Sequence, residues 1–151
     1  MKLMQRLAFS AAASLLVCGL AAAEKKVQLM DLPPAVQKTV QEETRHAKLV
    51  GLAQEEEGGK TVYEAETKID GKTRDLVIDA DGKVIEVEEE IALGSIPAGA
   101  KAAIEKAATG GKIERVETLT KAGTTNYEAT FTKNGKKSEI IVASDGTIKK
   151  Q

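Results

Sequence analysis

Residues 63–82, YEAETKIDGKTRDLVIDADG, decide the fold because they contain two predicted strands and the turns that close them. Apolar and polar residues alternate along this stretch, which is typical of strands with one buried face. Its turns are the pairs Asp70-Gly71 and Asp81-Gly82, which tolerate the positive φ angles of tight hairpins. A shift of 64 residues aligns the stretch with residues 127–146, YEATFTKNGKKSEIIVASDG, which keep the Tyr-Glu-Ala start and both turn positions. The sequence therefore predicts an internal duplication.

Each copy is predicted to contain one helix followed by four strands. Leu32-Pro33 and Ile96-Pro97 open the helices, because proline lacks only an N–H that the first helical turn does not use. Asp31 and Ser95 lie within capping reach, and the helices are expected to run to about Ala47 and Thr109. The strands are expected at 48–56, 61–69, 72–79 and 84–90, and again 64 residues later. We thus predict an α+β fold of two tandem repeats, each one helix packed on a four-stranded antiparallel sheet.

The N-terminus is predicted to be a signal peptide, residues 1–23. Lys2 and Arg6 introduce an apolar run from Leu7 to Leu20, and Ala21-Ala22-Ala23 supplies the small residues of a cleavage site. Cleavage after Ala23 removes Cys18, the one cysteine, and leaves a periplasmic or secreted protein with no integral membrane segment. The mature chain is then divided into an N-terminal extension (24–30), a first repeat (31–91) and a second repeat (92–151).

The composition argues against most catalytic and nucleic-acid functions. The 22 basic and 23 acidic residues nearly cancel in charge, so no global basic field favours binding of nucleic acid.

The only histidine, His46, is expected on the surface near the end of the first helix. Asp79-Ala80-Asp81-Gly82 is similar to the start of a calcium loop, but the later ligands are missing and a hairpin turn is the better interpretation. The runs 55–57 and 88–90, all glutamate, are interpreted as solvated. We predict no catalytic residue, no cofactor, no metal ligand and no enzyme activity.

The order of Leu/Ile-Pro, helix, Tyr-Glu-Ala strand, Gly-Lys turn and Asp-Gly turn resembles the PepSY family, in its tandem, beta-lactamase-inhibitory-protein-like branch. The resemblance covers residues 31–151 and implies duplicated helix-and-sheet units in an exported bacterial protein. It also implies action by protein–protein contact, since PepSY modules occur in propeptides of secreted metalloproteases and the inhibitory relatives bind an enzyme on a concave sheet face. Those relatives use aromatic-rich contacts, whereas this chain lacks Trp. That difference argues against inhibition of a beta-lactamase.

The predicted function is a non-enzymatic protein-binding module of the periplasm or the secreted fraction, a regulator or inhibitor of an envelope protease. The alternative is an envelope stress or cation-binding protein that uses the acidic first repeat. The partner is expected to be a protein, with an envelope peptidase as the candidate. The binding residues are expected on the sheet face that the helix leaves open, at Glu64, Glu66, Lys68, Asp75, Val77 and Asp79.

The two repeats differ in charge. Residues 31–91 contain 16 acidic and 8 basic side chains, and residues 92–151 contain 6 acidic and 10 basic ones. One interpretation is that the charges of the two repeats, both solvated, have drifted apart without a function. The other is that the chain has a bipolar surface that orients a partner or a second copy of the chain. Because exposed charge pairs are weak and screened by salt, the chain is expected to be a monomer or to self-associate weakly and in a salt-sensitive way.

Overall fold

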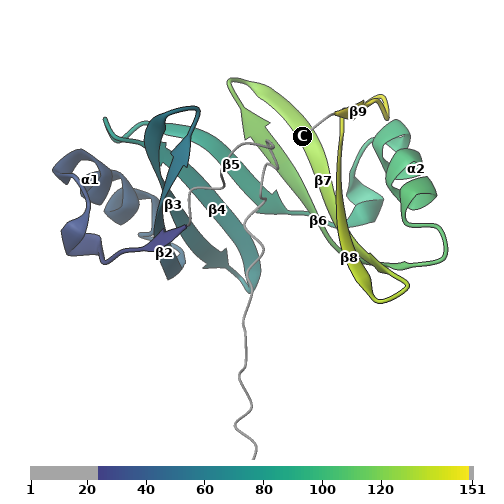
Figure 1. Ribbon diagram of the computed structural model, residues 1–151, viewed down its shortest axis with the longest axis horizontal. Helices are drawn as coiled ribbons and strands as arrows, with labels where there is room; N and C mark the ends of the chain where they lie inside the picture. Colours follow the sequence, from purple (N-terminus) through teal and green to yellow (C-terminus); the bar gives the residue numbers. More distant parts are fainter. Residues whose placement is uncertain (1–23, 150–151) are drawn as a thin grey trace, which may run out of the picture.

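The computed structural model describes residues 24–149, so the predicted signal peptide, Cys18 and the cleavage site lie outside the described part. The described chain forms one nine-stranded antiparallel sheet with two helices (Figure 1). The first half contains β1 (Lys25–Lys26), η1 (Leu29–Asp31), α1 (Pro34–Glu43), β2 (Lys48–Glu57), β3 (Lys60–Ile69), β4 (Lys72–Asp79) and β5 (Val84–Glu90). The second half contains η2 (Leu93–Ser95), α2 (Ala98–Ala107), β6 (Lys112–Lys121), β7 (Thr124–Lys133), β8 (Lys136–Val142) and β9 (Ile148–Lys149).

The predicted fold class, two tandem repeats that are each one helix packed on a four-stranded antiparallel sheet, is wrong, because all nine strands form a single sheet. β5 pairs with β6 from Glu86↔Lys121 to Glu90↔Glu117, and the strands follow one another in chain order from β1 to β9. Two separate sheets would leave the N–H and C=O groups of both β5 and β6 unpaired at an edge. Joining the sheets satisfies these groups. β1, which pairs with β2, was not predicted either.

Local signals predicted the strands better than the helix ends. The strand ranges of the first half agree with the prediction within one residue at each end. α1 ends at Glu43 and α2 at Ala107, both earlier than expected. The predicted caps are wrong, because Pro33 and Pro97 occupy the N-cap positions and no side chain caps either helix. The Asp31 carboxylate instead accepts a hydrogen bond from the Gln28 N–H at 3.2 Å.

Two apolar cores lie between the helices and the sheet. The buried residues of the first are Leu32, Val36, Val40, Tyr63, Ala65, Leu76 and Ile78. Those of the second are Ile96, Ala100, Ile104, Val116, Ala129 and Val142. Five positions of the first core recur 64 residues later in the second: 32 just before the helix, 36 and 40 in the helix, and 65 and 78 in the sheet. Each half therefore buries its own helix on the same side of the shared sheet.

The sheet is strongly curved. Lys121 Nζ on β6 lies 3.7 Å from Glu57 Oε2 on β2, although β3, β4 and β5 separate these strands. In a flat sheet, four strand spacings would place β2 and β6 about 19 Å apart, beyond the reach of the two side chains. Figure 1 shows α1 and α2 at opposite ends of the molecule, outside the bend. We call the sheet face opposite the helices the inner face.

Among residues 24–149, no helix combines the length and hydrophobicity needed to cross a bilayer.

The turn after β4 packs closely against α1. Gly82, with φ +83°, would bring an added Cβ within 2.7 Å of the Ala35 carbonyl oxygen. The Thr39 hydroxyl donates a hydrogen bond to the Gly82 carbonyl at 2.6 Å. Gly71 has the same φ, +83°, in the turn between β3 and β4, but nothing lies within 4 Å of its added Cβ. The two glycines thus differ in packing and not in backbone conformation.

This matched pair gives a test of the helix–turn contact. We expect Gly71→Ala to lower the free energy of unfolding by about 1–2 kcal/mol, because a side chain is strained at positive φ. Gly82→Ala should cost about 1 kcal/mol more, because the methyl group overpacks the contact with α1. Urea unfolding followed by far-UV circular dichroism measures both values. Equal costs would contradict the close approach of this turn to α1.

Candidate functional site

The inner face gathers three carboxyl groups where the two halves of the sheet meet. Asp75 on β4 is the register partner of Glu88 on β5, and Glu117 on β6 pairs with the last residue of β5, two positions beyond Glu88. Side chains two apart on a strand share a face, so all three point away from the helices. Their carboxylate oxygens lie within 4.8 Å of one another. We call Asp75, Glu88 and Glu117 the carboxyl cluster.

Neighbouring groups hold two members of the cluster in place. The backbone N–H of Thr67 donates a hydrogen bond to Asp75 Oδ1 at 3.1 Å. Glu117 accepts a hydrogen bond from the Thr73 hydroxyl at 3.0 Å, and Arg115 Nε lies 3.0 Å from its other oxygen. Within residues 24–149, the Glu88 carboxylate makes no hydrogen bond or ion pair. The cluster therefore has three carboxylates and one paired cation, the Arg115 guanidinium.

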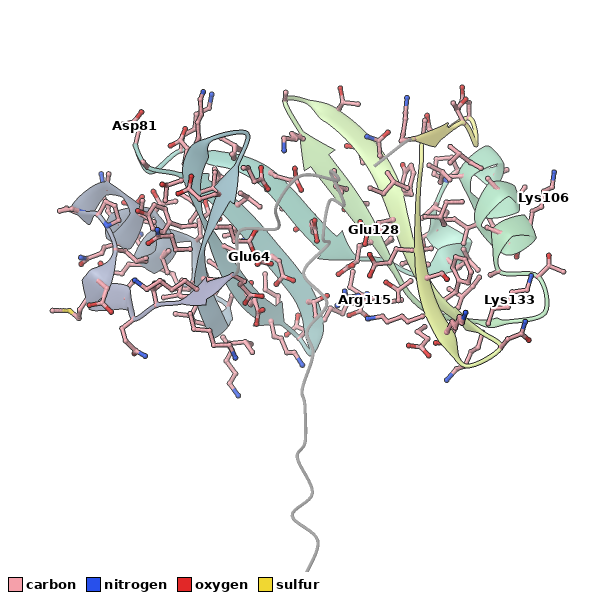
Figure 2. All side chains as sticks on the ribbon, viewed as in Figure 1. Glu64, Asp81, Lys106, Arg115, Glu128 and Lys133 are labelled. Atoms are coloured by element: carbon pink, nitrogen blue, oxygen red, sulfur yellow. The ribbon has the colours of Figure 1, made fainter. Side chains whose placement is uncertain are left out.

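Two further glutamates flank the cluster, one from each half. Glu128 on β7 is the register partner of Glu117, and Glu64 on β3 lies opposite Val77 of β4. Figure 2 shows Glu64 and Glu128 on the two halves of the inner face, with the cluster strands between them. Glu128 is only 3% exposed, and its Oε2 atom is buried without a hydrogen-bond partner in the described chain. An unpartnered buried carboxylate oxygen is unusual and energetically costly.

Burial and mutual repulsion raise the pKa values of this whole group. Burial, followed by the charge of Glu55, raises the pKa of Glu64 to about 8. Burial and the nearby charge of Glu128 raise the pKa of Glu88 to about 9. Burial and other acidic neighbours raise the pKa of Glu128 to about 7. Burial also raises the pKa values of Asp75 and Glu117, although hydrogen bonds and Arg115 oppose the shift.

One lysine bridges the two halves at the rim of the inner face. Lys121 Nζ lies 2.8 Å from Glu86 Oε2 on β5 and 3.7 Å from Glu57 Oε2 on β2. A hydrogen bond to the Glu86 carboxylate raises the pKa of Lys121. This cation offsets the charge of Glu86 and Glu57, and the centre of the inner face keeps more carboxyl groups than cations.

The structure places the six residues predicted for binding in different surroundings. Glu64, Glu66, Asp75 and Val77 alternate with core residues of β3 and β4 and lie on the inner face. Lys68 lies on the same face but is exposed toward the end of β3. Asp79 is engaged in the turn, because its Oδ1 accepts hydrogen bonds from the N–H groups of Asp81 at 3.0 Å and of Lys83 at 2.9 Å. The last observation confirms the hairpin interpretation of residues 79–82.

Sequence reasoning missed Glu88, Glu117 and Glu128. The run Glu88-Glu89-Glu90 was interpreted as solvated, which is wrong for Glu88, because β5 is an internal strand with a partner on each side. Glu89, in contrast, is exposed on the helix side, where it lies 3.2 Å from the Arg74 guanidinium. Residues 88–90 are all glutamate and show no alternation of apolar and polar residues. The available signal was the period of two, which places Glu86, Glu88 and Glu90 on one face of the strand and Glu89 on the other.

Comparison with known proteins finds a family model that matches part of the sequence and solved structures with a similar fold. Residues 20–88 match the PepSY model, described as peptidase propeptide and YPEB domain. A Bacteroides eggerthii protein described as periplasmic is 16% identical, with a TM-score of 0.62 over 78% of this chain and 85% of that one. A DUF2874 family protein from Bacteroides ovatus is 15% identical, with a TM-score of 0.57 over 78% and 84%. A BLIP-like protein from Bacteroides fragilis is 19% identical, with a TM-score of 0.54 over 78% and 83%. No curated protein matches the sequence.

Proposed function

Because residues 20–88 match the PepSY model and the fold is similar to that of a BLIP-like protein, we propose that this chain is a non-enzymatic protein-binding module of the bacterial periplasm. The compartment is supported by the Bacteroides eggerthii protein of the same fold, which is described as periplasmic. The peptidase-propeptide description of the matched model supports the finer proposal that the partner is an envelope protease. The chain would then regulate or inhibit that protease by contact, without chemistry of its own.

The observation that carries the proposal is the excess of carboxyl groups over cations on the inner face. Asp75, Glu88 and Glu117 meet there with Arg115 as their one ion-paired cation. A lysine or arginine side chain of a partner would gain charge-assisted hydrogen bonds from these carboxylates. We therefore propose that the partner presents a basic segment to the inner face.

Aromatic contacts contribute little to this surface. Tyr63 belongs to the first core and Tyr127 packs against the second, both on the helix side of the sheet. Phe131 is buried, and it alternates with residues that point to the inner face of β7. Recognition by charge in place of aromatic stacking should make association strongly dependent on salt.

Photo-crosslinking in the native envelope tests this surface. A crosslinking amino acid at Val77, in the centre of the inner face, should give a discrete adduct with a protein. The same amino acid at Lys106, which is exposed on α2 and points away from the sheet in Figure 2, is the matched control and should give none. The adduct at Val77 should weaken in the variant Glu64→Gln/Glu128→Gln, which removes two inner-face carboxyl groups.

The identity of the crosslinked protein tests the finer proposal. A peptidase with a basic segment at the crosslinked site would support regulation of a protease. Equal adducts at Val77 and Lys106, or an adduct that the double variant leaves unchanged, would contradict binding through the charge of the inner face.

A further inference from the structure

We propose that the carboxyl cluster, together with Glu128, binds a divalent cation of the size of Ca²⁺ at the junction of the two halves. The sequence alone assigned cation binding, as an alternative, to the acidic first repeat. The geometry points instead to ligands from both halves, because Asp75 and Glu88 come from the first and Glu117 from the second.

The spacing of the oxygens fits a large oxygen-binding cation. Two ligands on opposite sides of one ion can be no farther apart than twice the metal–oxygen distance. For Ca²⁺, with bonds of about 2.4 Å, this limit is about 4.8 Å, and for Mg²⁺ it is about 4.2 Å. The cluster oxygens lie within 4.8 Å of one another. This spacing is compatible with one Ca²⁺ ion between the three oxygens.

A second observation, independent of the cluster, is the buried oxygen of Glu128. This side chain is 3% exposed, and its Oε2 has no hydrogen-bond partner in the described chain. Glu128 is the register partner of Glu117, so its side chain lies beside the cluster on the same face of the sheet. A cation between these groups would supply the partner that the buried oxygen lacks.

The donor set selects for a hard cation. The ligands are carboxylates only, and the one histidine, His46, is exposed after α1 and far along the chain from the cluster strands. Carboxylate oxygens favour Ca²⁺ and Mg²⁺, whereas Zn²⁺ and Cu²⁺ prefer sites that contain nitrogen or sulfur. The hydrogen bonds from Thr67 to Asp75 and from Thr73 to Glu117 hold two ligands in position before the ion arrives. The three cluster carboxyl groups and Glu128 thus meet one ion-paired cation, the Arg115 guanidinium.

Calorimetric titration of the purified, chelator-treated protein with CaCl2 and with MgCl2 tests the proposal. We expect one Ca²⁺ per chain with a Kd of about 10⁻⁴ M or lower, within the range of extracellular calcium modules. Mg²⁺ should bind at least about tenfold more weakly, because its shorter bonds demand closer ligands. A rise in melting temperature with Ca²⁺ should accompany binding, since an ion that binds only the folded state stabilises it.

Two variants locate the site, and a third serves as the control. Glu88→Gln and Asp75→Asn should each weaken Ca²⁺ binding by about tenfold or more, because each removes a charged ligand. Glu89→Gln, one residue away but on the helix side, should leave the affinity within about twofold of wild type. Circular dichroism checks that all three variants fold. No saturable binding to wild type below about 10 mM Ca²⁺, far above this range, or an unchanged affinity in both cluster variants, would overturn the proposal. Because the titration needs no partner protein, its failure leaves the proposed protein-binding function standing.

Discussion

Replacement of Tyr63 by alanine should lower the free energy of unfolding by about 3–5 kcal/mol, the cost of removing a large aromatic side chain from a packed core. Tyr63 is 9% exposed and belongs to the core beneath α1, where Val36 and Val40 are 0% and 1% exposed. Its backbone is held between Gln54 of β2 and Ile78 of β4. Because these ladders restrain the strand on both sides, the structure cannot collapse fully into the cavity, and most of the cost remains.

Tyr127, the residue 64 positions later, is the matched control. The duplication predicts the same cost for Tyr127→Ala, but Tyr127 is only partly buried at the margin of the second core. We therefore expect Tyr127→Ala to cost about 1–2 kcal/mol less than Tyr63→Ala, since less apolar area is lost. Urea unfolding followed by far-UV circular dichroism suits both variants, because the chain has no Trp. A cost below about 1 kcal/mol for Tyr63→Ala would show that this ring is not part of a packed core.

The strands and turns could be predicted from the sequence because their signals are local. Asp70 and Asn134 adopt positive φ, 51° and 52°, directly before Gly71 and Gly135, as the Asx-Gly pairs predict. Alternation along β3 and β4 also separated the core side from the inner face, with Tyr63 on one and Glu64 on the other. Such patterns depend only on residues within a few positions of each other.

The joining of the two halves could not be predicted in the same way. Pairing of β5 with β6 brings together residues about 30 apart, such as Glu86 and Lys121, and an edge strand can show the same alternation as an internal one. The burial of Glu88 and Glu117 depends on this pairing, so both were missed. All six residues predicted for binding come from the first half, whereas the carboxyl cluster needs Glu117 from the second. Asp79 was assigned to binding because alternation cannot reveal that its carboxylate accepts hydrogen bonds from the turn.

The inner-face carboxyl groups should also make the protein less stable as the pH rises from about 5 to about 9 in the presence of a chelator. The pKa values of Glu128, Glu64 and Glu88 are raised from 4.5 to about 7, about 8 and about 9. The folded state therefore keeps protons that the unfolded state has already released. The resulting stabilisation is fully present below the unfolded value of 4.5 and is lost as the pH passes through the folded values.

The size of this effect follows from the number of protons retained. Each extra proton held by the folded state changes the free energy of unfolding by about 1.4 kcal/mol per pH unit. One extra proton on average between pH 5.5 and pH 8 thus corresponds to a loss of about 3 kcal/mol. Urea unfolding at pH values across this window, with EDTA present to exclude divalent cations, measures the slope.

Substitution of Glu88 by glutamine separates this effect from general charge repulsion. Glu88→Gln removes a carboxyl group that burial and the Glu128 charge keep protonated, so the slope should decrease and the stability at pH 8 should rise above that of wild type. Glu89→Gln removes the same charge from the neighbouring position on the helix side, where Glu89 lies 3.2 Å from Arg74, and should leave the slope unchanged. A stability that is flat or increases from pH 5.5 to pH 8 in wild type would mean that the inner-face carboxylates are ionised at little cost. In that case the carboxylates carry their charge without a cost of burial or repulsion, and both a basic partner segment and a divalent cation would gain less by binding them.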